Sequence, residues 1–318
     1  MTPKEKYRQL CETEESIPLF SRDWWLDIVC GSSKWDVVLI EENDKIRAAM
    51  PCYKPLPNVI SMPPYTQTMG PWFAPEADDM KYTTRLSQRQ QLCASLIDGL
   101  GNYSSFLQLC SYSFTDWLPF YWTGFQQTTR YTYVLHNLSD KESLWEGMSS
   151  NIRRNITKAK EKKGIVVRKG IPWDDFLDVF KATFKRQGKA VPKDIHILKQ
   201  LVEAAIKRGL GDIWGGYDNE GRLHAAVFVV WQKSSAYYIA GGGDPTLRDS
   251  GAHSLAMWEA IQYVAEHTQT FDFEGSMIPG VERFFREFGA KQMPYFTITR
   301  GKLSLINRIK IKLRGYSK

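Results

Sequence analysis

Apolar and polar positions follow the periods of helices and strands most clearly in the second half of the chain. The first predicted helix there begins at the capping-box sequence Ser139–Glu142 and continues through a basic stretch that ends before Gly164. The pattern then predicts a strand, two helices, a meander of three strands, a helix, a strand, a helix and a final strand. Their ranges are 165–168, 173–187, 193–207, 212–217, 222–231, 235–240, 250–267, 271–274, 280–289 and 295–299.

The first half of the chain shows a shorter version of the same order. The predicted ranges are helices at 22–29 and 80–100, strands at 37–41, 45–53, 106–110 and 131–135, and a short helical piece near Asp116. A chain of 318 residues is longer than a single core usually supports. We therefore predict an α/β (α+β) protein of two domains, 1–138 and 139–318.

Composition places the chain among globular proteins, with 43% hydrophobic and 24% charged residues. No apolar run is long enough for a membrane span, and the polar residues 1–6 lead into no signal core, so we expect a cytoplasmic protein. The five cysteines are widely spaced and never form Cys-x-x-Cys, which favours buried, reduced thiols. No pair of histidines has metal-ligand spacing, so no metal is predicted.

The net charge of +7 predicts an anionic partner, such as a phosphate compound, a nucleic acid or a membrane face. The excess cations are concentrated in residues 153–163 and in the tail 302–318. Apolar residues are interleaved with the cations of the tail. The tail therefore either docks on its own domain, which we favour, or makes a peripheral contact with an anionic membrane.

Three segments carry a resemblance to a known family. They are Asn151–Ala159 (NIRRNITKA), Phe271–Ser276 (FDFEGS) and Gly280–Gly289 (GVERFFREFG). Together with the order of elements, they resemble the Fem-type branch of the GNAT superfamily, which contains aminoacyl-tRNA-dependent peptidyltransferases and related acyl-CoA-dependent acyltransferases. The resemblance covers most of residues 139–300 and is weaker before them.

This resemblance implies tandem GNAT-like domains, each with a mixed, largely antiparallel sheet flanked by helices. It places the acceptor side in the degenerate N-terminal domain and the donor side in the C-terminal one. The implied activity is transfer of an acyl group to an amine, in bacterial cell-envelope precursor or surface-glycan metabolism. The implied acceptor is an anionic or nucleotide-linked small molecule.

One departure from the family bears on the donor. Peptidyltransferase members usually have Phe-Lys where this chain has Phe284-Phe285. The absent lysine favours acyl-CoA as the donor, and aminoacyl-tRNA, with tRNA as the partner, stays the alternative. An alternative from a different functional class is a non-catalytic basic binding protein on the same fold.

The donor site is predicted in the connection after the meander. The family holds the donor pyrophosphate on backbone N–H groups at the start of the next helix. Arg248 and Gly251 match the first and fourth positions of the pattern Arg/Gln-x-x-Gly-x-Gly/Ala, whereas His253 replaces its small sixth residue. Donor contacts are therefore predicted at Gly241, Gly242, Gly243, Arg248, Gly251 and Ala252. The alternative is a plain glycine-rich turn capped by Ser250.

Candidate catalytic groups are two carboxylates in Phe271–Glu274. Strand alternation points both phenylalanines to one face, and Asp272 and Glu274 to the other, about 7 Å apart. A carboxylate at the end of a central strand can take the proton of an acceptor amine. Equally, the pair can cap the following turn or bind Arg283 or Arg286.

Further side chains are predicted to contact the acceptor. Tyr65, Gln67 and Trp72 lie in the long irregular segment 63–72, which either binds acceptor or packs a domain interface. The remaining candidates are Arg153, Asn155, Tyr238, Ser276, Arg283 and Arg286.

Overall fold

The computed structural model describes residues 1–77 and 79–302. The chain divides into two compact units, Met1–Arg130 together with the chain from Pro294 onward, and Tyr131–Met293. Strand β6 (Gln126–His136) runs from the first unit into the second, and strand β12 (Lys291–Gly301) returns to the first. The predicted domains, divided after residue 138, place this returning strand in the second domain. The structure differs because Thr297–Gly301 pair with Leu109–Ser105 in the first unit.

The sheet of the first unit follows the order β1-β2-β3-β5-β12, with β4 on β2. The bounds are β1 Trp35–Glu42, β2 Lys45–Leu56, β3 Val59–Ser61, β4 Trp72–Phe73 and β5 Ser105–Leu109. β3 and β5 are parallel, and the other pairs are antiparallel. The turn between β1 and β2 uses Asn43 and Asp44 with φ of 50° and 60°, as a two-residue hairpin of the primed type requires.

The helices of the first unit are α1 (Pro3–Thr13), the 3₁₀ turn η1 (Leu19–Ser21), α2 (Asp23–Cys30), α3 (Tyr82–Asp98) and α4 (Leu118–Trp122). α3 and α4 cover a core that contains Leu96, Phe106, Phe120 and Phe125. The rings of Phe106 and Phe125 meet edge to face at 5.1 Å. This core fixes the segment between β5 and α4.

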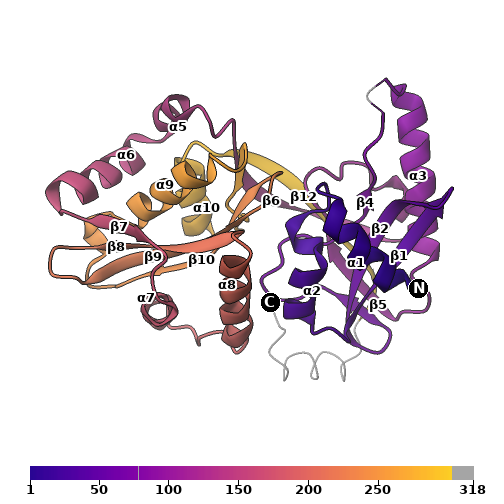
Figure 1. Ribbon diagram of the computed structural model, residues 1–318, viewed down its shortest axis with the longest axis horizontal. Coiled ribbons are helices and arrows are strands. Elements are labelled where there is room, and N and C mark those ends of the chain that lie inside the picture. Colours follow the sequence, from indigo (N-terminus) through magenta and orange to yellow (C-terminus); the bar gives the residue numbers. More distant parts are fainter. Residues whose placement is uncertain (78, 303–318) are drawn as a thin grey trace. The chain divides into compact units, whose positions relative to one another are not determined.

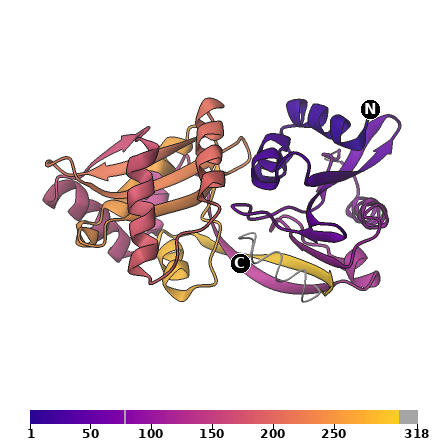
Figure 2. The ribbon, with the colours of Figure 1, turned by 90° about the horizontal axis from the view of Figure 1, so that it is seen from below.

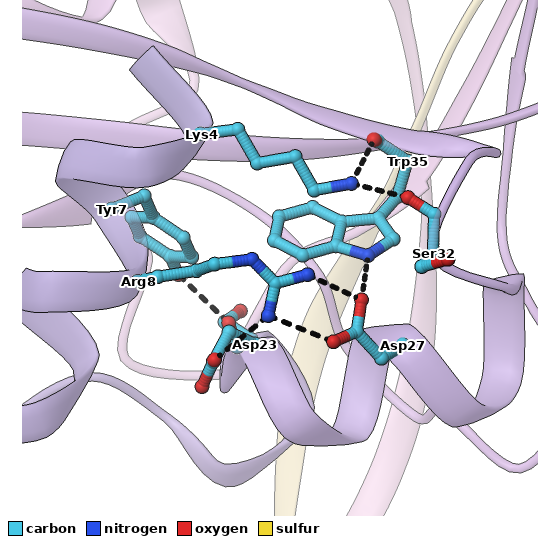
Figure 3. Close-up of polar contacts among 8 residues, drawn as sticks. Lys4, Tyr7, Arg8, Asp23, Asp27, Ser32 and Trp35 are labelled. Atoms are coloured by element: carbon cyan, nitrogen blue, oxygen red, sulfur yellow. Dashed lines mark hydrogen bonds and ion pairs between the residues drawn. The ribbon is translucent and has the colours of Figure 1, made fainter. Parts of the chain in front are cut away.

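A polar cluster joins α1, α2 and β1 (Figure 3). Arg8 binds both oxygens of Asp27 at 2.8 Å, and the indole Nε1 of Trp35 donates to the same carboxylate at 2.9 Å. The ammonium of Lys4 lies 3.9 Å from the centre of the Trp35 ring. Helix α1 was not predicted, although Thr2 and Glu5 form a capping box at its start.

The sheet of the second unit follows the order β6-β11-β10-β9-β8-β7. The strand bounds are β7 Val166–Lys169, β8 Gly211–Tyr217, β9 Leu223–Trp231, β10 Ala236–Gly243 and β11 Thr270–Asp272. The helices are α5 (Lys141–Gly147), α6 (Ser150–Thr157), the π-helix η2 (Lys158–Lys162), α7 (Trp173–Arg186), α8 (Ile195–Lys207), the 3₁₀ turn η3 (Arg248–Ser250), α9 (Ala252–Val264) and α10 (Pro279–Glu287). Helices α7 and α8 cover one face of this sheet, and α5, α6, α9 and α10 cover the other (Figures 1 and 2).

The predicted order of elements after residue 164 and the fold class are confirmed, with differences at some bounds. The single helix predicted from Ser139 is two helices, because Asp140 caps α5 and Ser149 caps α6. The predicted turn at Gly241–Gly243 is the end of β10, which keeps its pairing with β9 to Gly243.

All five cysteines are buried and outside any disulfide, as predicted, and burial raises the pKa of Cys11 to about 11. In the part of the chain that the structure describes, no helix is long and apolar enough to cross a membrane. Over the same residues, no group of three or more His, Cys, Asp or Glu side chains could hold a metal ion. The tail predicted to dock or to touch a membrane lies, apart from its first residue, outside the described residues.

Candidate active site

The sheet of the second unit opens between β10 and β11. These two strands pair in parallel only at Ala236↔Phe271 and Tyr237↔Asp272. β11 ends at Asp272, whereas β10 continues to Gly243. Within residues 1–77 and 79–302, no strand therefore pairs with the second edge of β10 beyond Tyr237. Such an edge presents backbone donors and acceptors to an extended ligand.

Tyr238 is the first residue of this unpaired stretch. Its ring lies edge-on to the rings of His253 in α9, at 6.4 Å, and Phe285 in α10, at 5.9 Å. A Cβ at Gly241 would collide with the Tyr238 hydroxyl, so the glycine provides the space that the tyrosine occupies. Burial raises the pKa of Tyr238, and the charge of Glu274 raises it further. The phenol is therefore protonated at neutral pH and can donate a proton.

His253 connects the start of α9 with β10 and α10. Its ring packs against Phe284 at 5.4 Å and forms a hydrogen bond with the backbone of Gly242. Burial lowers the pKa of His253 to about 4, so the imidazole is neutral at pH 7. His253 was not among the site residues predicted from the sequence. The sequence feature that could have indicated it is its position, the sixth of the donor pattern, where a small residue is usual.

The two predicted carboxylates have different surroundings. Asp272 is 2% exposed, and its Oδ1 accepts hydrogen bonds from the Thr132 hydroxyl and, at 2.8 Å, from the N–H of Glu274. This second bond is an Asx turn, which ends β11 and gives Glu274 a left-handed φ of 59°. The predicted strand through Glu274 is therefore too long by two residues, because the turn interrupts the alternation.

The phenylalanines of the same segment behave as predicted. Phe271 and Phe273 are both in the core of the second unit, with ring centres 4.9 Å apart. Phe273 also stacks on Phe285 at 5.1 Å. Glu274 is half-buried at the end of this packed strand, and its charge acts on Tyr238. Glu274 is thus the carboxylate that the structure brings to the tyrosine, whereas Asp272 holds the turn.

The predicted donor residues are divided between β10 and the start of α9. Gly251 has φ of 81°, and a Cβ there would collide with the carbonyl of Asn155 in α6, so both backbone conformation and packing require glycine. The N-cap of α9 is Gly251, which has no side chain to cap the helix, and Arg248 is exposed in η3. The N–H of Ala252 already donates to the Ser250 hydroxyl at 3.2 Å, and that of Gly243 donates to the Thr183 hydroxyl at 3.0 Å.

The predicted acceptor residues of α10 and its approach mostly stabilise the helix itself. Arg283 pairs with Glu287 and Arg286 with Glu282, at 2.8 and 2.9 Å. Ser276 accepts the N–H of Ile278 at 3.0 Å, just before the helix begins. The phenylalanine that replaces the family's lysine, Phe285, is 4% exposed and contacts Tyr238.

Arg153 and Asn155 lie in α6, where both are half-buried. The backbone of Asn155 contacts Gly251, so α6 supports the start of α9. The Asn151–Ala159 segment therefore has a structural role, support of α9, in addition to the acceptor binding that was predicted for it.

The predicted acceptor loop belongs to the first unit. Thr66 and Gln67 are buried, Trp25 donates to the Thr66 hydroxyl at 3.0 Å, and Tyr65 has a left-handed φ of 52°. Trp72 is 5% exposed and donates to Ser16 at 2.9 Å. Of these residues, Trp72 lines a groove of about 790 Å³ in the same unit.

Comparisons with known proteins bear on the fold that carries this site. Residues 147–286 match the family described as an acetyltransferase (GNAT) domain. A search of curated proteins found no match. Among solved structures, the crystal structure of FemX is similar with a TM-score of 0.67 and 12% identity, over 98% of each chain.

Two further solved structures share the fold. L-PGS from Bacillus licheniformis has a TM-score of 0.53 and 12% identity, over 100% of this chain and 98% of that chain. A tandem GNAT protein from the clavulanic acid biosynthesis pathway has a TM-score of 0.50 and 10% identity, over 88% of this chain and 95% of that one. The tandem GNAT-like fold that the resemblance implies is thereby confirmed.

Proposed function

We propose that this chain, whose residues 147–286 belong to the GNAT family of acetyltransferase domains, transfers an acyl group from an acyl-CoA thioester to an amine. The observation that carries the proposal is the edge of β10 from Tyr238 to Gly241, with which no strand of the described residues pairs. An acyl-CoA has an extended arm with two amide groups and a pyrophosphate. The arm can bond to the strand edge, and the pyrophosphate to the start of α9.

In this proposal, Tyr238 and Glu274 are the groups that act on the reacting atoms. The acceptor nitrogen attacks the thioester carbonyl and forms the new C–N bond, while the C–S bond breaks. Glu274, as a carboxylate, takes the proton that the nitrogen loses. Tyr238, which is protonated, donates a hydrogen bond to the sulfur that leaves as a thiolate. Asp272 acts as a positioning residue, since it fixes the turn that carries Glu274.

The side chains of α10 favour an acyl-CoA thioester over aminoacyl-tRNA as the donor. Phe285 takes the place of the family's lysine, and it is packed between Phe273 and Tyr238. Arg283 and Arg286 are already paired with glutamates of the same helix. This helix therefore offers little unpaired positive charge to a nucleic acid.

The acceptor we propose is an amine on an anionic or nucleotide-linked small molecule, consistent with the net charge of +7. The pathway we propose is cell-envelope precursor or surface-glycan metabolism. The alternatives are aminoacyl-tRNA as the donor, or a non-catalytic binding protein.

Titration calorimetry with CoA, followed by transfer assays with acetyl-CoA and with aminoacyl-tRNA, separates the three. CoA binding with transfer from acetyl-CoA to an amine supports the proposal. Transfer from aminoacyl-tRNA without CoA binding favours the second donor. Neither binding nor transfer favours the binding protein.

A further inference from the structure

The groove in the first unit lies apart from the GNAT domain along the sequence, and the transfer chemistry does not use it. Its walls are β4, one side of α3 and the segment 111–119, and its volume of about 790 Å³ is that of a small-ligand site. We propose that this groove binds an uncharged carbohydrate.

The first argument is the set of aromatic rings along the groove. Trp72, Phe73, Tyr82, Phe114 and Trp117 all line it. Two of these rings have a fixed neighbour before any ligand binds: Trp72 donates to Ser16 at 2.9 Å, and Trp117 makes an edge contact with Tyr121 at 5.4 Å. The face of an aromatic ring is electronegative, and it attracts the C–H bonds on one face of a sugar ring. Fixed rings lower the entropy cost of that stacking.

The second argument is the balance of charge. Arg85 and Arg89 both pair with Glu76, at 3.1 and 2.8 Å, and the Glu76 side chain is only 8% exposed. On the opposite wall, Asp116 accepts the amide of Gln90 at 2.8 Å. Two guanidinium groups and two carboxylates give these four side chains no net charge. Such a groove gives no electrostatic preference to an anion or a cation.

The third argument is hydrogen-bonding capacity. Arg89 and Asp116 are planar groups held by the partners above, and each has further donor or acceptor sites. The hydroxyls of Ser111 and Ser113 also line the groove and bond to each other at 2.9 Å. Polar groups beside aromatic rings complement a ligand whose hydroxyls surround an apolar ring face. Among small uncharged ligands, carbohydrates have that surface.

Tyr82 and Trp122 give a matched pair of variants for a test. The side chain of Tyr82 is 72% exposed and lines the groove, whereas Trp122 is 62% exposed, at the end of α4, and does not line it. Both can be replaced by alanine without opening the core. The more buried Trp117 provides a milder third variant, Trp117→Phe, which keeps a stacking face.

The experiment measures binding of the full chain to arrays of uncharged and acidic oligosaccharides, with inorganic phosphate as a soluble competitor. We expect binding to at least one uncharged series. Tyr82→Ala should weaken it by about tenfold, and Trp122→Ala by less than about twofold. Trp117→Phe should retain most of the binding.

Three results would each overturn the inference. They are binding to no oligosaccharide on the array, equal losses in Tyr82→Ala and Trp122→Ala, and binding confined to acidic sugars that phosphate displaces. The last result would identify Arg85 and Arg89 as an anion site instead. Because the three variants lie in the first unit and the readout is binding, the result does not depend on whether the chain transfers an acyl group.

Discussion

The hydroxyl of Tyr238 occupies the space that a side chain at Gly241 would need. Both residues lie on β10, and the absence of a side chain at Gly241 leaves room for the phenol ring of Tyr238. We predict that Gly241→Ala displaces Tyr238 and lowers kcat by about a hundredfold, since small misplacements of a reacting group are costly. Gly280→Ala is the control, because a Cβ there meets no neighbouring atom.

A double-mutant cycle tests the same relationship by stability. If the collision is with the hydroxyl, Gly241→Ala should destabilise the Tyr238→Phe variant less than it destabilises the wild type, in urea unfolding. Equal losses in the two backgrounds would mean that the Ala226 carbonyl, 2.9 Å from the same Cβ, causes the strain.

Substitution of Glu274 should impair catalysis, whereas substitution of Asp272 should impair folding stability. Glu274→Gln keeps the shape and removes the charge, so kcat should fall by about two orders of magnitude with nearly unchanged affinity for CoA. Asp272→Ala should lower the free energy of unfolding by about 1–3 kcal/mol, because it leaves the Thr132 hydroxyl and the Glu274 N–H without their acceptor. Near-normal kcat in Glu274→Gln would exclude the carboxylate as the base.

His253 should make stability depend on pH in a definite window. Its pKa is lowered to about 4 from the ordinary 6.5, so between these values the unfolded chain binds more protons than the folded one. Stability from this group is therefore present above pH 6.5 and is lost as the pH falls towards 4. In thermal unfolding, His253→Phe should show a shallower loss over this window than the wild type. Identical slopes would contradict the assignment.

Asp27 should be a large contributor to the stability of the first unit. It binds Arg8 twice and Trp35 once, and these bonds join α1, α2 and β1 (Figure 3). Asp27→Ala should cost about 2–3 kcal/mol in urea unfolding. Asp36→Ala is the control. The Asp36 side chain is 54% exposed, and its ion pair with Lys54 is long, at 3.5 Å, so it should contribute little to stability. Similar losses in both variants would argue against the cluster.

The sequence predicted the second unit well because its elements have local signals. Gly188, Gly209 and Gly289 each mark a helix end, and each has a positive φ in the structure. The break at Met148 was missed because the cap of the second helix, Ser149, interrupts no apolar period. The three glycines of β10 look like a turn, yet pairing with β9 keeps them extended.

The site was only partly predictable for a related reason. The alternation in Phe271–Glu274 correctly placed both phenylalanines in the core. It could not predict the Asx turn of Asp272, because a two-residue period contains no information on where the strand ends. The groove was missed, apart from Trp72, because β4, α3 and residues 111–119 are brought together only by the core around Phe106 and Phe120. No motif in any one of these segments indicates it.

Hydrogen–deuterium exchange with and without CoA tests the central claim most directly, because it locates the donor as well as detecting it. If the donor lies along the open edge of β10, CoA should slow exchange of amides in Tyr238–Gly243 and at the start of α9, around His253 and Ser254. Arg248→Ala should weaken this protection without moving it. Protection elsewhere in the chain, or none at CoA concentrations that saturate other GNAT enzymes, would contradict the account.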